Sequence, residues 1–375
     1  MKNEFKTIVV MGDVLRPWAG GDHMTSGAFR NIQWTHHLIK RAVTSAGLPI
    51  HALDWNRHSG QIAYKRIDIA DYYQKRGLEI SVPNWSKLAG QESGCPILAE
   101  ALAPHLDGAL VVGYEMSKVQ IATLESMGVA YIDLVLHPAR FAPDILHAMR
   151  TNSQRVHDVL RHCHFDSDRL YAAAADIQAK ICRLGRTMNT SHDTALILGQ
   201  VWTDRAVAKP GGGFYKLDEF ADQIADTVHR HSAVLYKPHP YERISGETSQ
   251  IKDMFRSIST TEANYYVVLC QPTVSSVYGL NSSCLYEAGF FGRKASYWIK
   301  PQYQLNDHLR GDSLGLGDFA TLSEVWVDPA FWAAILNGKT ADFSGTRNHI
   351  TPGRLRKSMN TDWGYSQINE ATIKL

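Results

Sequence analysis

The stretch Ala195–Gly213 reads ALILGQVWTDRAVAKPGGG, and it decides the fold expected for the second half of the chain. Its first residues, Ala195–Leu198, form a short apolar run that predicts a buried β-strand. The run stops at Gly199-Gln200, and a polar loop with a glycine triplet follows. In open α/β folds, ligands bind where parallel strands end, and glycines let the backbone approach them closely. We therefore expect a ligand site in the loop that carries Asp204 and Arg205, although a surface ion pair in a flexible loop would give the same pattern.

Strand-like and helix-like runs alternate on both sides of this stretch. Before it, Thr7–Met11 and Ala109–Gly113 read as strands, and each is followed by apolar residues at helical spacing. After it, Val234–Tyr236 and Tyr266–Leu269 read as the next strands. This alternation predicts an α/β fold with two Rossmann-like domains, whose parallel sheets face an inter-domain cleft.

The length of the chain also favours two domains, because 375 residues are too many for one ordinary core. A polar stretch near the middle, 186–193, reads as a linker. We expect an N-terminal Rossmann-like domain over residues 1–185 and a second, ligand-binding domain over 186–330. Residues 331–375 would form a helical tail that could pack back on the first domain.

Composition excludes several classes of protein. The formal net charge is +2 with no long Lys/Arg run, which argues against a nucleic-acid binder. The five cysteines lack a paired spacing, which favours reduced thiols and a cytoplasmic protein. No apolar stretch approaches the length of a transmembrane helix, so we expect peripheral association with the inner face of the cytoplasmic membrane at most. The adjacent residues His162-Cys163-His164 cannot converge on one ion, so we expect no metal site.

A second motif, Tyr236-Lys237-Pro238-His239-Pro240, directly follows a predicted strand. The two prolines fix the backbone around Lys237 and His239. An ammonium and an imidazole held at the end of a strand suit a phosphate group. The alternative is a rigid turn with incidental polar residues.

A third motif, Gly279–Glu287, reads GLNSSCLYE. Ser282 and Ser283 stand at the predicted start of a helix, where free N–H groups and the helix dipole favour an anion. Glu287 lies one turn further on and would suit a ribose hydroxyl. Helix capping alone would explain one of the two serines.

Taken together, the patterns GQxxxD, YKPHP and SSxxYEAxxxG resemble the retaining β-Kdo transferases of bacterial capsule and lipopolysaccharide synthesis, the KpsC/KpsS-like enzymes. The resemblance covers the second half of the chain well. In the first half, Val112–Glu115, Tyr131–Asp133 and Arg140-Phe141 look like the more variable acceptor-side strands of that group.

The resemblance implies a GT-B-like enzyme that moves Kdo from CMP-β-Kdo to a glycan acceptor, such as an O-antigen or a capsule, with retained configuration. The acceptor could be lipid-linked, and no cofactor is required. Asp204 would be the nucleophile, with Gln200 positioning it, and Arg205 is a candidate partner for the sugar carboxylate. The phosphate and ribose would contact the remaining side chains of the motifs: Lys237, His239, Ser282, Ser283 and Glu287.

This chemistry is consistent with the residue types. A carboxylate can trap an oxocarbenium-like sugar covalently, and attack by the acceptor hydroxyl then restores the configuration. Lys237, a protonated His239 and the helix start would stabilise the departing CMP. The acceptor base should come from the first domain, where Asp133 is our first choice and Glu115 and Asp13 are alternatives.

Three other functions fit parts of the pattern. A transferase for sialic acid or another CMP-nonulosonate would use the same phosphate motifs. A UDP-sugar 2-epimerase shares the twin Rossmann-like architecture but needs no acceptor. A non-catalytic glycan-binding module would bind glycan without releasing CMP.

Overall fold

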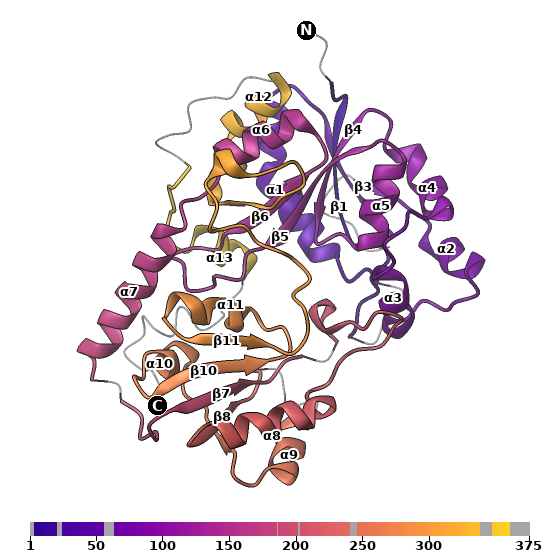
Figure 1. Cartoon of the computed structure of the whole chain (residues 1–375). Helices are drawn as coiled ribbons and strands as arrows, with labels where there is room; N and C mark the ends of the chain where they lie inside the picture. Colours follow the sequence, from indigo (N-terminus) through magenta and orange to yellow (C-terminus); the bar gives the residue numbers. More distant parts are fainter. Residues whose placement is uncertain are drawn as a thin grey trace.

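The computed structural model describes residues 4–20, 25–55, 64–185, 187–201, 203–240, 246–337 and 347–360. They form two α/β halves, each built around its own sheet (Figure 1). The predicted α/β class with two sheet-based halves is confirmed, but the first sheet is mixed and not, as predicted, purely parallel. None of the described helices combines the length and the apolar character that crossing a membrane requires.

The first sheet has seven strands in the order β12-β6-β5-β4-β1-β2-β3. Pairing is parallel from β5 to β3, whereas β6 and β12 are antiparallel to their neighbours. The strands are β1 (Thr7–Gly12), β2 (Ile50–Asp54), β3 (Tyr64–Arg66), β4 (Ala109–Tyr114), β5 (Ala130–Leu136), β6 (His147–Thr151) and β12 (Ala320–Leu322). The helices of this half are α1 (Phe29–Ser45), α2 (Ile69–Lys75), α3 (Val82–Ala89), α4 (Pro96–Leu102), α5 (Lys118–Ser126), α6 (Gln154–His162), α12 (Pro329–Asn337) and α13 (Arg354–Met359).

Alternate residues of β1 enter different cores, because successive side chains of a strand point to opposite faces. Ile8 and Val10 pack with α1, α6 and α12, whereas Val9 and Met11 pack with α2 to α5. Both faces of the sheet are therefore covered, which explains why β1 and β4 are almost continuously apolar.

The second sheet has five parallel strands in the order β11-β10-β7-β8-β9. Its strands are β7 (Thr194–Leu198), β8 (Ala233–Lys237), β9 (Ser259–Thr260), β10 (Val274–Gly279) and β11 (Lys294–Tyr297). Its helices are α8 (Ala221–Arg230), α9 (Glu247–Met254), α10 (Tyr265–Leu269) and α11 (Ser283–Phe290), and α7 (Asp168–Arg183) packs beside α11.

Two predictions about this half are wrong. The run Tyr266–Leu269 lies in the short helix α10, not in a strand. Short, fully buried apolar runs do not distinguish a strand from a helix by periodicity, and Asn264 caps this one by accepting the Tyr266 N–H. The predicted boundary at residue 330 is also too late, because β12 already pairs with β6 of the first sheet.

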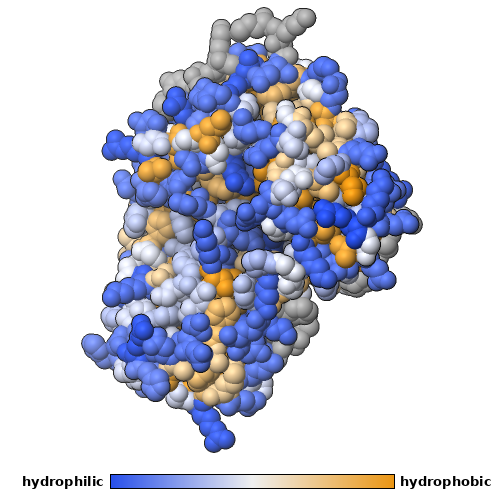
Figure 2. Space-filling model, turned by 45° about the vertical axis from the view of Figure 1, so that its right-hand side comes forward, coloured by the Kyte–Doolittle hydropathy of each residue, from blue (hydrophilic) through white to orange (hydrophobic). Residues whose placement is uncertain are grey.

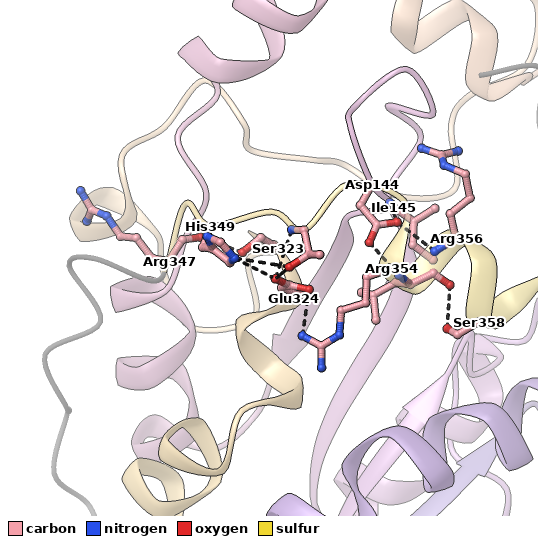
Figure 3. Close-up of polar contacts among 11 residues, drawn as sticks. Asp144, Ile145, Ser323, Glu324, Arg347, His349, Arg354, Arg356 and Ser358 are labelled. Atoms are coloured by element: carbon pink, nitrogen blue, oxygen red, sulfur yellow. Dashed lines mark hydrogen bonds and ion pairs between the residues drawn. The ribbon is translucent and has the colours of Figure 1, made fainter. Parts of the chain in front are cut away.

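The end of the described chain lies on the first half. Helix α12 packs against α1 and α6. In the first turn of α13, the main-chain N–H groups of Leu355 and Arg356 donate to the Asp144 carboxylate at 2.7 and 2.8 Å (Figure 3). The Arg356 guanidinium in turn donates to the carbonyls of Arg140 and Ala142. The loop after β5 is thereby fixed from one side by the C-terminal segment.

Candidate functional site

The three motifs predicted in the second half lie at neighbouring strand ends. In the sheet, Leu198 at the end of β7 is paired with Lys237 at the end of β8 and with Gly279 at the end of β10. The Gly199 N–H continues this pairing by donating to the Lys237 carbonyl at 2.9 Å. A side chain at Gly199 would come within 2.5 Å of the Tyr236 hydroxyl and 3.0 Å of the His239 nitrogen, so only glycine allows this approach.

Two amide side chains join the loops after β7 and β10. The Asn281 N–H donates to Gln200 Oε1 at 3.1 Å, and Gln200 Nε2 donates to the Asn281 carbonyl at 3.5 Å. Asn281 Nδ2 also donates to the Ala206 carbonyl at 3.2 Å. Asp204 lies within the loop held in this way, and its exposed carboxylate accepts the Ala206 N–H at 3.1 Å. The amides thus fix the backbone on which Asp204 stands.

Three of the predicted phosphate-binding residues, Lys237, Ser282 and Ser283, lie at or near the start of α11. Ser282 caps the helix by accepting the Cys284 N–H at 3.3 Å. Lys237 is near enough to Cys284 for the two groups to interact electrostatically. Burial lowers the pKa of the Lys237 ammonium, whose hydrogen bond to the Ala263 carbonyl measures 2.6 Å. Ser283 is the first residue of α11, and His239 is half-buried beyond the end of β8.

Glu287 is more buried than we expect for a residue that contacts a ribose. Its side chain is buried, and Oε1 accepts the N–H groups of Arg140 and Phe141 at 2.6 and 3.2 Å and the Tyr266 hydroxyl at 3.0 Å. Burial raises the pKa of this carboxyl to about 7. Glu287 therefore joins α11 to the loop after β5 of the first half, and its contact with a ribose stays a prediction.

Two of the three acids considered as acceptor base have structural partners. The Asp13 carboxylate accepts the Trp85 Nε1–H at 2.9 Å and the Leu15 N–H at 3.1 Å. Asp133 is 0% exposed, and its ion pair with Arg150 measures 3.0 Å. A base must reach the proton that it removes, so the structure favours neither residue over Glu115.

Glu115 differs from these two acids in its backbone and its surroundings. It has a left-handed backbone with φ of 51° directly after β4, and its side chain is half-buried. Strained conformations of this kind occur often at functional sites. Burial raises the pKa of the Glu115 carboxyl, the cations Arg16 and Arg205 lower it, and the charge of Asp204 raises it further. The carboxylates of Glu115 and Asp204 thus influence each other across the junction of the halves.

Arg205 does not pair with its neighbour Asp204. Its guanidinium crosses the junction and donates to the Glu115 main-chain carbonyl. It also lies 5.6 Å from the ring centre of Tyr303, and it interacts electrostatically with Asp13 and Asp133. Arg205 is therefore the residue through which the second half contacts the acids of the first.

Further contacts close the junction around these groups. The Gly213 N–H donates to Ser86 Oγ in α3 at 2.8 Å, and the Phe214 ring lies 6.4 Å from that of Trp85. Hydrophilic residues gather where the two lobes meet (Figure 2). A cavity of about 1230 Å³ lies elsewhere, lined by the end of α6, the start of α7, Gly311 and Arg347.

Sequence reasoning missed three residues of this arrangement. Asn281 is part of the quoted GLNSS motif but was not assigned a role. Arg16 follows the first strand closely and Tyr303 comes from the loop after β11. The position of Arg16 just beyond a strand end could have identified it as a site residue. Tyr303 lies in a segment without periodicity, so no local pattern indicated its place.

No family model matches the chain, and no curated protein matches it in sequence. Among solved structures it is similar to KpsC of Thermosulfurimonas dismutans, a beta Kdo 2,7 transferase, with 14% identity and a TM-score of 0.38 over 94% of this chain and 99% of that one. The beta Kdo 2,4 transferase of the same protein gives 14% identity and a TM-score of 0.34 over 60% and 78%. A dipicolinate synthase chain from Bacillus halodurans gives 10% identity and a TM-score of 0.20 over 76% and 79%. These values describe distant structural relationships.

Proposed function

We propose that this chain is a glycosyltransferase that moves Kdo from CMP-Kdo to a hydroxyl of a glycan acceptor with retained configuration. The observation that carries the proposal is the pairing of the Gln200 side-chain amide with the main chain of Asn281, which holds the Asp204 loop and the start of α11 together at one sheet edge. A nucleophile and a phosphate cradle must be fixed relative to each other for in-line displacement. The opposite half supplies Glu115, an acid that interacts with Asp204 across the junction.

The first step is the departure of CMP. The Asp204 carboxylate attacks the anomeric carbon of Kdo while the bond from that carbon to the phosphate oxygen breaks. The released phosphate gains charge, and Lys237, His239 and the N–H groups at Ser282 and Ser283 stabilise it. The product of this step is a glycosyl ester on Asp204 together with free CMP.

The second step transfers the sugar. Glu115 accepts the proton of the acceptor hydroxyl, and the resulting oxygen attacks the anomeric carbon from the face that CMP has left. The ester bond to Asp204 breaks, and its carboxylate is regenerated. Two displacements at one carbon give net retention. Burial around Glu115 raises its pKa, which favours its acting as a proton acceptor at neutral pH.

The test is CMP release from enzymatically generated CMP-Kdo over a panel of glycan acceptors. We expect Asp204→Asn to lower turnover by about a thousandfold or more, whereas Glu115→Gln should slow transfer and spare the first release of CMP. CMP binding, measured by calorimetry, should persist in both variants. Release from CMP-Neu5Ac instead of CMP-Kdo would assign another sugar acid. Equal turnover by wild type and Asp204→Asn would reject the mechanism.

A further inference from the structure

Arg16 is held in a fixed position on the first half of the junction. Its guanidinium carbon lies 4.9 Å from the ring centre of Trp85. The Trp85 side chain is fully buried and donates a hydrogen bond to the Asp13 carboxylate. The backbone of Arg16 is fixed as well, because its N–H donates to the Asp13 carbonyl at 3.1 Å and its carbonyl accepts the Gly27 N–H at 2.8 Å. A cation stacked on a rigid ring loses little freedom when it binds a ligand.

The guanidinium of Arg16 has no acceptor among the residues that the structure describes. Arg16 is half-buried, yet its side chain makes no hydrogen bond or ion pair with any residue that the structure describes. Two other arginines at the junction are occupied: Arg205 donates to the Glu115 carbonyl, and Arg150 pairs with Asp133. None of the Arg16 nitrogen atoms is among the buried polar atoms without a partner, so the donors are accessible, and their fixed orientation makes them available to an acceptor on a ligand.

The position of Arg16 indicates what kind of ligand this is. Among the charges around Glu115, that of Arg16 has the largest effect on its carboxyl, although the two side chains form no ion pair. An anionic substrate group beside Glu115 would otherwise be repelled by that carboxylate. The expected phosphate site lies in the other half, beside Lys237, so a second anionic group of the substrate is needed to use Arg16. A guanidinium presents a planar fork that matches a carboxylate.

We propose that Arg16 binds a sugar carboxylate at the junction and thereby makes the protein selective for acidic sugars. This inference rests on the proposed function and adds to it a specificity residue in the first half. The carboxylate could belong to the donor sugar or to an acidic acceptor sugar, and the two sources place different demands on catalysis.

The direct test is binding of the full chain to the methyl glycoside of Kdo and to its methyl ester, followed by NMR titration. The wild type should prefer the acid by about tenfold or more, and Arg16→Gln should reduce that preference to about twofold or less. Arg30→Gln is the matched control, because Arg30 also lies over a tryptophan, Trp18, at 5.8 Å, but its side chain is exposed. It should keep the wild-type preference. An equal preference in wild type and Arg16→Gln would overturn the proposal.

Arg16→Lys provides a second variant in case the glutamine variant does not fold. Lysine keeps the charge and loses the planar fork, so the preference for the acid should fall at least about threefold. An unchanged preference in this variant would also overturn the proposal.

Kinetics then separate the two sources of the carboxylate. If it belongs to the donor, Arg16→Gln should raise KM for CMP-Kdo and slow CMP release without an acceptor. If it belongs to the acceptor, that background release should be unchanged and only KM for acidic acceptors should rise. Preference for the acid without CMP release from any CMP-sugar would reject the proposed function and leave the role of Arg16 intact. Normal transfer by the wild type, together with an unchanged preference for the acid in Arg16→Gln, would reject the role of Arg16 and leave the proposed function intact.

Discussion

Arg205 of the second half donates a hydrogen bond to the main-chain carbonyl of Glu115, the residue with a left-handed backbone at the end of β4. The bond ties the loop of the expected nucleophile to the expected acceptor base. The Arg205 guanidinium also lies 5.6 Å from the ring centre of Tyr303 and interacts electrostatically with Asp13 and Asp133. This guanidinium is thus one of the groups that join the two halves, and it lies at the place where the proposed chemistry occurs.

Replacing Arg205 should therefore destabilise the protein. Arg205→Ala removes the hydrogen bond to the Glu115 carbonyl and one of the cations that face the buried acids of the first half, so we expect the free energy of unfolding to fall by about 2–4 kcal/mol. Urea denaturation followed by circular dichroism measures this change. Arg230→Ala is the control, because Arg230 forms an exposed pair with Asp226 and should cost less than about 1 kcal/mol. Similar losses in the two variants would contradict this role.

Glu287 should make stability depend on pH. Burial raises its pKa from 4.5 to about 7 in the folded state, so the folded protein retains a proton that the unfolded chain has lost. Stability should consequently fall as the pH rises from about 5 to 7.5, by at most about 3 kcal/mol, and level off above that range.

Glu287→Gln isolates this effect. The amide oxygen can accept the same N–H groups from Arg140 and Phe141, and the amide nitrogen replaces Oε2, which has no hydrogen-bond partner among the described residues. The difference in unfolding free energy between wild type and this variant should change with pH over the stated range. A difference that is constant with pH would show that Glu287 ionises normally.

The Asn281 side chain should matter for catalysis more than for CMP binding. Asn281→Ala removes the bond from Asn281 Nδ2 to the Ala206 carbonyl and loosens the loop that carries Asp204. We expect kcat to fall by about ten- to a hundredfold, because small losses of positioning are costly, with CMP affinity within about threefold of wild type. Steady-state kinetics and calorimetry measure the two quantities. A loss confined to CMP affinity would place Asn281 in the nucleotide site instead.

Lys237 should contribute to binding of the phosphate. Lys237→Met keeps most of the buried side chain and removes the ammonium near the start of α11, so the affinity for CMP should fall by about tenfold or more and depend less on salt. Cytidine, which lacks the phosphate, should bind wild type and variant alike. Lys209→Met is the control, because the Lys209 ammonium forms an ion pair with Glu219 at 2.6 Å and is not one of the residues of the expected phosphate site. Equal CMP affinity in all three proteins would exclude Lys237 from the phosphate site.

The fold of this chain could be predicted because its parallel strands are buried on both faces. The continuous apolar run of Ile8 to Val10 is typical of a strand that is buried on both faces. The order of strand, loop and helix then places the polar motifs at one edge of the sheet. The prediction of a strand at Tyr266–Leu269 failed because a short apolar segment shows no periodicity that distinguishes a strand from a helix. The short strand β12 was missed for the same reason.

The candidate site could be predicted only in part. Asp204, Lys237 and Ser282 follow strand ends, which local sequence reveals. Contacts across the junction involve residues far apart in the chain, such as Arg205 with Glu115, and no local pattern records them. The burial of Asp133 and Glu287 also depends on how the two halves pack, so their environments were accessible only from the structure.

The most direct test is to look for a covalent sugar on the protein. Wild type is incubated with CMP-Kdo generated in situ and without acceptor, then denatured, digested and mapped by peptide mass spectrometry. We predict that one peptide gains the mass of a Kdo residue at Asp204, that added acceptor removes the adduct, and that Asp204→Asn carries none. Modification of a different residue, or CMP release by Asp204→Asn at the wild-type rate, would contradict the account.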